Sequence, residues 1–176
     1  LSPRGGRVAV CCGGGANGGD GLVAARVLKE GGSEVQVFIC APRARYPEPV
    51  RANLERARAA GVPVLPAEDE PALQAGLARA DVILDGILGT GSSGAPEGVI
   101  RRVIEAVAVS GKPVVAIDLP SGLDPDTGLA GGACVKAALT LTLGLPKRGL
   151  VAARARSLVG ELKVLGIGFP EDLLTP

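Results

Sequence analysis

Short apolar runs alternate with amphipathic segments along most of this chain. The first run, Val8–Cys12, precedes a glycine-rich stretch at 13–21, which we interpret as a loop, and a segment with helical spacing at 22–28. β-Branched runs that alternate with amphipathic helices are typical of parallel strands buried on both faces. The pattern predicts an α/β fold. Further strands are expected at 34–40, 62–65 (an edge strand), 81–85, 113–118, 138–143 and 162–165, and further helices at 50–60, 71–80 and 96–109.

The order of strands and helices places the polar segments of the chain together. Right-handed crossovers put the loops that follow parallel strands on one edge of the sheet. Ligands of open α/β sheets bind outside the carboxyl ends of the strands. The stretch 13–21, Asp85 with 89–94, Asp118 with Ser121, and Lys147 all follow predicted strands. We therefore expect them to converge on one crevice.

Length and composition limit the classes of protein to which the chain can belong. Its 176 residues suit one domain, 1–176, and its 47% hydrophobic content argues against disorder. The absence of a long apolar stretch or a signal-peptide pattern predicts a soluble, cytoplasmic protein without a membrane partner. A net charge of +1 and three aromatic residues give no support for nucleic-acid binding. The chain has no Met and begins with Leu, so we expect the natural protein to begin earlier.

Cysteine and histidine content narrows the chemistry. The four cysteines, Cys11, Cys12, Cys40 and Cys134, have no zinc-like spacing and are interpreted as reduced, mostly buried thiols. The sequence has no histidine, which excludes Ser-His and Cys-His mechanisms within one chain. Acid–base work must then fall to Asp, Glu, Lys, Tyr or bound water.

Two glycine-rich stretches could contact phosphate groups. Gly13, Gly15 and Gly18 match the dinucleotide pattern G-x-G-x-x-G, and a second glycine loop spans 89–94. Backbone N–H groups of such loops can hold the two phosphates of a dinucleotide, although the second loop could also be a simple connection. A P-loop motif is absent. An NAD(P)-dependent oxidoreductase usually has an acid after its second strand, where this chain has Cys-Ala-Pro-Arg at 40–43, and this counts against that function.

Two carboxylates end otherwise apolar strands. Asp85 and Asp118 each need a hydrogen-bond partner or a cation there, and capping of a loop is the alternative for either one alone. Asp85, Asn17 and Ser121 offer only oxygen ligands at low total charge, which suits a hard, monovalent cation. Asp20 is expected to cap its helix or to brace the loop.

Four blocks of the sequence resemble the NAD(P)H-hydrate (NAD(P)HX) epimerase family. They are 13–21 (GGGANGGDG), 85–91 (DGILGTG), 116–124 (AIDLPSGLD) and 144–149 (GLPKRG). The resemblance implies a Rossmann-like three-layer αβα sandwich with a mostly parallel sheet. It also implies an isomerase that interconverts the R and S forms of hydrated NADH and NADPH (NADHX and NADPHX) in nicotinamide nucleotide repair.

The resemblance also assigns ligands. It implies one potassium ion per subunit on Asn17, Asp85 and Ser121. Residues expected to contact the substrate are Ala16, Asn17, Gly18, Gly19, Asp20, Gly89, Thr90, Gly91, Ser92, Ser93, Gly94, Ala95 and Asp118.

The same resemblance implies two partners. They are a second copy of the chain in a homodimer and an ADP- or ATP-dependent NAD(P)HX dehydratase, which in some relatives is fused after the epimerase.

The chain differs from the usual family pattern at three places. The chain has Ala16-Asn17 where the family usually has two asparagines, and it has no basic residue near Gly94. The family's leading helical segment, which helps to cover the site and the dimer contact, is missing.

Epimerisation at C6 of the nicotinamide ring needs a proton carrier at the hydroxyl and negative charge near an iminium cation. We assign both roles to Asp118. Lys147 is a second candidate, for which a structural role or contact with a substrate phosphate is the stronger interpretation. The alternative functions are a non-catalytic dinucleotide- or ADP-ribose-binding module, or a protein-interaction module, since some relatives are described through apolipoprotein A-I, and an NAD(P)-dependent oxidoreductase.

Overall fold

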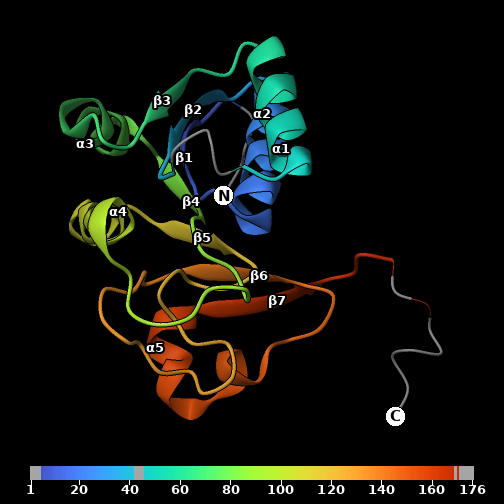
Figure 1. Cartoon of the computed structure of the whole chain (residues 1–176), viewed down its shortest axis with the longest axis vertical. Helices are drawn as coiled ribbons and strands as arrows, with labels where there is room; N and C mark the ends of the chain where they lie inside the picture. Colours follow the sequence, from blue (N-terminus) through green and yellow to red (C-terminus); the bar gives the residue numbers. More distant parts are fainter. Residues whose placement is uncertain (1–4, 42–45, 169, 171–176) are drawn as a thin grey trace.

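The computed structural model describes residues 5–41, 46–168 and 170, and it contains one seven-stranded sheet (Figure 1). All neighbouring strands pair in parallel, in the order β3-β2-β1-β4-β5-β6-β7, which confirms the predicted α/β class. This order reverses between β1 and β4, as in Rossmann-type sheets. The strands are β1 (Arg7–Cys12), β2 (Glu34–Ile39), β3 (Val64–Pro66), β4 (Val82–Gly86), β5 (Val114–Ile117), β6 (Leu139–Leu143) and β7 (Glu161–Leu165).

Helices cover both faces of the sheet. Figure 1 shows α1 and α2 on one side of the sheet and α3 and α4 on the other, which gives the expected three layers. Two separate apolar clusters fill the spaces, one under each pair of helices. The helices are α1 (Ala16–Glu30), α2 (Glu48–Ala59), α3 (Glu70–Arg79), α4 (Gly98–Val109) and the short α5 (Arg156–Val159).

Strand β1 lies at the centre of both clusters. Val8, Val10 and Cys12 pack toward α1 and α2, whereas Ala9 and Cys11 pack toward α3 and α4. Successive side chains of a strand point to opposite faces, so a strand covered on both sides must be apolar throughout. Burial on both faces therefore explains the uninterrupted apolar run in the sequence. The same packing fixes the carboxyl end of β1 next to β4, where the site forms.

The first helix begins earlier than the sequence analysis predicted. Helix α1 starts at Ala16, so only Gly13–Gly15 form the turn and 16–21 are helical. Glycines allow this tight turn, because a Cβ atom on Gly18 would lie 1.9 Å from the Gly13 carbonyl oxygen. The predicted cap is also wrong. Gly15 is the N-cap and has no side-chain cap, while Asp20 lies one turn further along.

Three other helices start one or two residues from their predicted positions: α2 two residues earlier, α3 one residue earlier and α4 two residues later. Asp69 caps α3 by accepting a hydrogen bond from the Ala72 N–H at 3.1 Å, so α3 begins at Glu70. Helix α4 begins at Gly98 because Glu97 before it is extended. The predicted edge position of β3 is confirmed.

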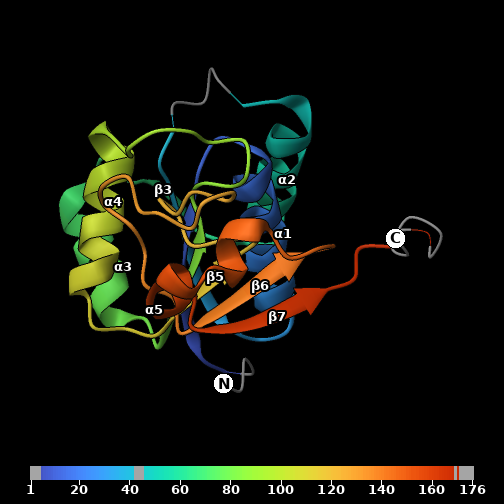
Figure 2. The same ribbon diagram turned by 90° about the horizontal axis from the view of Figure 1, so that it is seen from below.

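The chain after β5 adds β6 and β7 to the sheet, and Figure 2 shows α5 next to these strands. Two 3₁₀ turns, η2 (Arg148–Val151) and η3 (Ala153–Ala155), lead into α5. They pack on the segment after β5 through Leu119, Leu123 and Leu150. This cluster anchors the two loops that carry Asp118 and Lys147.

The remaining sequence predictions concern thiols and membranes. Cys11, Cys12 and Cys40 are buried and Cys134 is partly exposed, which confirms the prediction that most of the thiols are buried. No helix in the described parts of the chain is both long enough and apolar enough to span a membrane. Residues 42–45, which include Arg43 of the segment after the second strand, lie outside the described residues.

Candidate active site

A pocket of about 390 Å³ opens at the carboxyl ends of the central strands, where the strand order reverses. It is lined by the turn after β1, the start of α1, the loop after β4, one residue of α4 and the residue after β5. The lining residues are Gly14, Gly15, Ala16, Asn17, Asp20, Ile87, Leu88, Gly89, Thr90, Gly91, Ser92, Ile100 and Asp118. The structure therefore brings the turn after β1, the loop after β4 and Asp118 into one crevice, whereas Asp85, Ser121 and Lys147 do not line it.

Asp118 is held rigidly at the end of β5. Its backbone has a φ of +68°, and it is the only non-glycine residue with positive φ in the described part of the chain. Its N–H donates to the Leu141 carbonyl at 2.9 Å, which ties it to β6. Left-handed backbone in a non-glycine residue is strained, and such strain clusters at functional sites. The position of this carboxylate is thus determined by the sheet itself.

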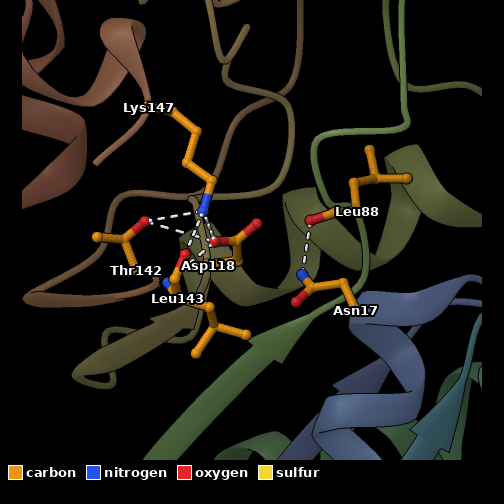
Figure 3. A network of polar contacts seen from close by, with 6 residues as sticks. All are labelled: Asn17, Leu88, Asp118, Thr142, Leu143 and Lys147. Atoms are coloured by element: carbon orange, nitrogen blue, oxygen red, sulfur yellow. Dashed lines mark hydrogen bonds and ion pairs between the residues drawn. The ribbon is translucent and has the colours of Figure 1, made fainter. Parts of the chain in front are cut away.

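The two carboxylate oxygens of Asp118 have different surroundings. Oδ1 accepts hydrogen bonds from the Leu143 N–H at 3.1 Å, from the Thr142 hydroxyl at 3.4 Å and from the Lys147 ammonium. Among the described residues, no donor reaches Oδ2. Figure 3 shows this second oxygen on the side of the carboxylate that faces away from Lys147, toward Asn17 and Leu88. Asp118 can therefore offer one free oxygen to a molecule in the pocket.

Lys147 serves Asp118 rather than lining the pocket. Its ammonium contacts Asp118 Oδ1, the Thr142 hydroxyl at 3.2 Å and the Leu143 carbonyl at 3.0 Å, as Figure 3 shows. An ammonium has three donors, and these partners occupy all three. The side chains of Lys147 and Asp118 are only 19% and 14% exposed. The geometry favours the structural interpretation of Lys147, and its contact with substrate stays a prediction.

Asp85 and Ser121 form a buried pair below the pocket floor. Both are fully buried. The Ser121 hydroxyl donates to Asp85 Oδ1 at 2.6 Å, and the Ser121 and Ile87 N–H groups donate to Oδ2 at 2.8 Å and Oδ1 at 3.2 Å. Burial raises the pKa of Asp85 to about 6, although these three hydrogen bonds oppose the rise. The carboxylate is therefore a site where positive charge would be stabilising.

Asn17 reaches the same cluster from α1. Its amide nitrogen donates to the Leu88 carbonyl at 2.7 Å, and the Leu88 N–H donates to the Ser121 hydroxyl at 2.9 Å. Asn17 Oδ1 is buried without a hydrogen-bond partner, alone among the buried side-chain oxygens and nitrogens of the described residues. A buried unpaired oxygen is costly. Together with a carboxylate and a hydroxyl, it fits a monovalent cation that takes oxygen ligands.

Close contacts explain the glycines around this cluster. A Cβ atom on Gly13 would lie 1.9 Å from the Ile87 carbonyl oxygen, and one on Gly89 would lie 3.1 Å from Asn17 Cβ. The turn after β1 and the loop after β4 therefore touch through backbone. These two glycines are needed for that packing.

The predicted substrate residues divide into groups. Ala16, Asn17, Asp20, Gly89, Thr90, Gly91, Ser92 and Asp118 line the pocket, whereas Gly18 and Gly19 are buried in α1 and do not. Ser93, Gly94 and Ala95 line a second pocket of about 230 Å³, which shares Leu88 and Ser92 with the first. Burial raises the pKa of Asp20, and the nearby Asp118 adds to the rise.

Sequence reasoning did not identify Thr142. Its hydroxyl contacts both members of the Asp118–Lys147 pair, and it is fully buried. A signal was present, because threonines alternate with leucines in strand 139–143. Polar residues repeated on one face of a buried strand need partners, and this could have pointed to the site.

Comparisons with known proteins found relatives over most of this chain. Residues 1–149 match the family described as YjeF-related protein N-terminus. The bifunctional NAD(P)H-hydrate repair enzyme Nnr of Thermofilum pendens is 45% identical over 168 residues, which are 94% of this chain and 32% of that protein. The NAD(P)H-hydrate epimerase of Elusimicrobium minutum is 37% identical over 171 residues, 96% of this chain and 76% of that protein.

A solved structure has the same fold. The crystal structure of yeast ynu0 (YNL200c) superposes with a TM-score of 0.83 at 28% identity, and the match covers 96% of this chain and 70% of that chain. The chain spans about a third of the length of the bifunctional relatives and about three quarters of the Elusimicrobium epimerase. On these matches, the chain belongs to the YjeF-related N-terminal family of NAD(P)H-hydrate epimerases.

Proposed function

We propose that this domain is an isomerase that interconverts the R and S forms of NADHX and NADPHX at C6 of the nicotinamide ring. Relatives at 36% to 45% identity carry the names NAD(P)H-hydrate epimerase and NAD(P)H-hydrate repair enzyme. The observation that carries the proposal is the free Oδ2 of Asp118. This oxygen lies in a pocket formed by two glycine-rich segments. The sequence has no histidine that could carry the proton in place of Asp118.

Asp118 is proposed to move the proton in both directions. The lone pair of ring nitrogen N1 forms a double bond to C6 as the C6–O bond breaks. Oδ2 of Asp118 delivers to the departing hydroxyl a proton that it has taken up from solvent, and the hydroxyl leaves as water. The carboxylate then stands beside the iminium cation. The flat cation then turns its other face toward Asp118, and water adds to C6 on that face and gives its proton to Oδ2, so that atoms and charge balance. General acid–base catalysis of this kind contributes about 10²–10⁴ in rate.

Lys147 is proposed to position Asp118. Its ammonium, the Thr142 hydroxyl and the Leu143 N–H all hold Oδ1, so Oδ2 remains the oxygen that meets substrate. A proton carrier that is fixed in place needs no reorganisation during the reaction. The strained backbone of Asp118 supports the same interpretation.

We propose one potassium ion on Asn17, Asp85 and Ser121. The unpaired Asn17 Oδ1 and the buried Asp85 carboxylate support this assignment. When bound, the ion supplies a fixed positive charge that offsets Asp85 and orders the segment after β4. The proton transfer remains with Asp118.

The natural protein is proposed to act with a dehydratase. The relatives named bifunctional NAD(P)H-hydrate repair enzyme are single chains about three times as long as this one. We propose that an ADP- or ATP-dependent dehydratase consumes one epimer, either fused or separate, and that the domain forms a homodimer. A cytoplasmic location remains a prediction.

The decisive experiment follows the interconversion of purified NADHX epimers by chromatography. We expect the wild type to equilibrate them and Asp118→Asn to lose activity by about 10²–10⁴ while remaining folded, as circular dichroism would show. Asp81→Asn is the matched control, because Asp81 precedes β4 at the opposite edge of the sheet in an exposed pair with Arg7. Full activity of Asp118→Asn would remove Asp118 from the mechanism.

The same experiment separates the alternative functions. A non-catalytic module would bind ADP-ribose without equilibrating the epimers. An oxidoreductase would transfer hydride when it is given an oxidised nicotinamide cofactor and an alcohol. Either outcome would contradict the proposed epimerase.

A further inference from the structure

The site pocket continues into the second pocket. The two share Leu88 and Ser92, and their volumes of about 390 and 230 Å³ together suit an extended ligand. Asp118 and Asn17 line only the first, so the reacting ring belongs there. The second pocket is then free for the other end of a dinucleotide.

Unpaired donors lie between the two pockets. Among the described residues, the N–H groups of Thr90, Gly91, Ser93 and Gly94 donate to no protein acceptor, whereas the Ser92 N–H closes a turn on the Gly89 carbonyl at 3.1 Å. Backbone N–H groups clustered in a glycine-rich loop bind anions. The loop after β4 is therefore suited to bind a diphosphate that spans the two pockets.

The second pocket combines apolar walls with one carboxylate. Leu88, Leu123 and Leu129 line it, and Asp124 lies at the same wall, while no lysine or arginine is among its described lining residues. Asp124 Oδ1 accepts from the Thr127 N–H and hydroxyl, both at 2.7 Å. These hydrogen bonds lower the pKa of Asp124 and leave Oδ2 to accept further donors.

We propose that the second pocket holds the adenosine half of the substrate, and that Asp124 selects NADHX over NADPHX. A purine suits the leucine walls, and a ribose diol can donate to the Asp124 carboxylate. The 2′-phosphate of NADPHX would meet that carboxylate without a neighbouring cation, and like charges repel. This inference rests on the proposed function and names the substrate preference of the same site.

A larger pocket elsewhere fits the adenosine less well. It has about 410 Å³ and lies between α2 and β3, with Arg58 and Glu68 on its walls. It shares no lining residue with the site pocket. Gly14 of the site pocket packs closely against Ala41 of the larger pocket, because a Cβ atom on Gly14 would lie 2.9 Å from Ala41 Cβ.

Blocking the second pocket tests the placement of adenosine. A Cβ atom on Gly131 would lie no closer than 3.8 Å to Ala95, and its φ is not left-handed, so Gly131→Leu narrows the pocket without strain. We expect the ratio of kcat/KM for NADHX to kcat/KM for the hydrate of reduced nicotinamide mononucleotide to fall about tenfold or more, because adenosine burial is lost. If Gly131→Leu does not fold, Ser93→Leu makes the same test. An unchanged ratio would overturn the proposal.

Asp124→Asn tests the selectivity. We expect the wild type to prefer NADHX over NADPHX by about tenfold in kcat/KM, and Asp124→Asn to reduce this preference, since hydrogen bonds to charged groups are stronger than neutral ones. Arg58→Gln, in the pocket between α2 and β3, is the matched control and should keep the preference. A preference that changes in Arg58→Gln but not in Asp124→Asn would place adenosine in the other pocket and overturn the proposal.

Binding of ADP-ribose separates this inference from the proposed function. If the wild type equilibrates no epimers, the epimerase proposal fails, but calorimetry with ADP-ribose still reports on the second pocket. Weaker ADP-ribose binding by Gly131→Leu than by wild type supports the adenosine site. Equal binding by both proteins contradicts it, whatever the activity.

Discussion

Lys147 and Asp118 form a shielded ion pair in which the ammonium holds one carboxylate oxygen and leaves the other to the pocket. The pair joins the residue after β5 to the loop after β6, which are neighbouring parallel strands. Its geometry depends on the backbone of Asp118, whose φ of +68° turns the chain at the end of the strand. Charge, hydrogen bonds and backbone thus fix one oxygen in space.

The backbone of Asp118 should cost stability. Glycine adopts positive φ without strain, whereas residues with a Cβ atom pay about 1 kcal/mol or more. Asp118→Gly and Asp118→Ala both remove the carboxylate, so their difference isolates the backbone. We expect Asp118→Gly to be more stable than Asp118→Ala by about 1 kcal/mol in urea unfolding. Equal stabilities would show that the turn is not strained.

Lys147→Met should affect catalysis more than binding. The three donors of Lys147 go to the protein, so its loss should free the Asp118 carboxylate to move and lower kcat about tenfold or more, within the range of a misplaced proton carrier. The Kd for ADP-ribose, measured by calorimetry, should stay unchanged. Lys147→Arg should restore part of kcat, because it keeps the charge but not the geometry. A weakened Kd with normal kcat would instead identify Lys147 as a phosphate ligand.

Gly13 and Gly15 should differ sharply in their tolerance of a methyl group. A Cβ atom on Gly13 would collide with the Ile87 carbonyl oxygen at 1.9 Å, whereas nothing lies within 4 Å of one on Gly15. Gly13→Ala must push the turn after β1 away from the loop after β4. We expect it to lose about 1–3 kcal/mol of unfolding free energy, as overpacked sites do. Gly15→Ala is the matched control, and a similar loss in both would contradict the packing argument.

The apolar runs predicted the strands and the meeting place of the site, because burial on both faces demands uninterrupted apolar residues. Asp85, Asp118 and Asn17 could be placed at one edge for the same reason. Short-range preferences were less informative at α1, where Gly18 and Gly19 are helical despite their poor propensity. Contact between α1 and the neighbouring turn outweighs that propensity.

Side-chain partners could not be predicted from the spacing of residues. The assignment of Lys147 depends on where its three donors go, and Thr142 and the Leu143 carbonyl come from the end of β6. Likewise, the unpaired oxygen of Asn17 follows from the position of the Leu88 carbonyl, 71 residues later. Such long-range contacts arise only after the sheet has formed.

Asp85 should make stability depend on pH when no cation is present. Burial raises its pKa to about 6 in the folded protein, whereas an unfolded Asp titrates near 3.9. The folded state therefore binds more protons than the unfolded state between these values. The contribution of Asp85 to stability is present below about pH 4 and is lost as pH rises through about 6. This difference in pKa between the folded and the unfolded protein corresponds to about 3 kcal/mol of unfolding free energy.

A potassium ion should reduce this loss, because it stabilises the ionised carboxylate. We expect the free energy of unfolding at pH 7.5 to be higher in potassium chloride than in tetramethylammonium chloride of equal ionic strength, with little difference at pH 5, where Asp85 is mostly protonated. Asn17→Ala removes the unpaired oxygen and should weaken the potassium effect. Glu105→Gln, at an exposed pair on α4, is the control that should preserve it. Urea titrations in the two salts check the prediction, and the same pH dependence in both would rule out a cation beside Asp85.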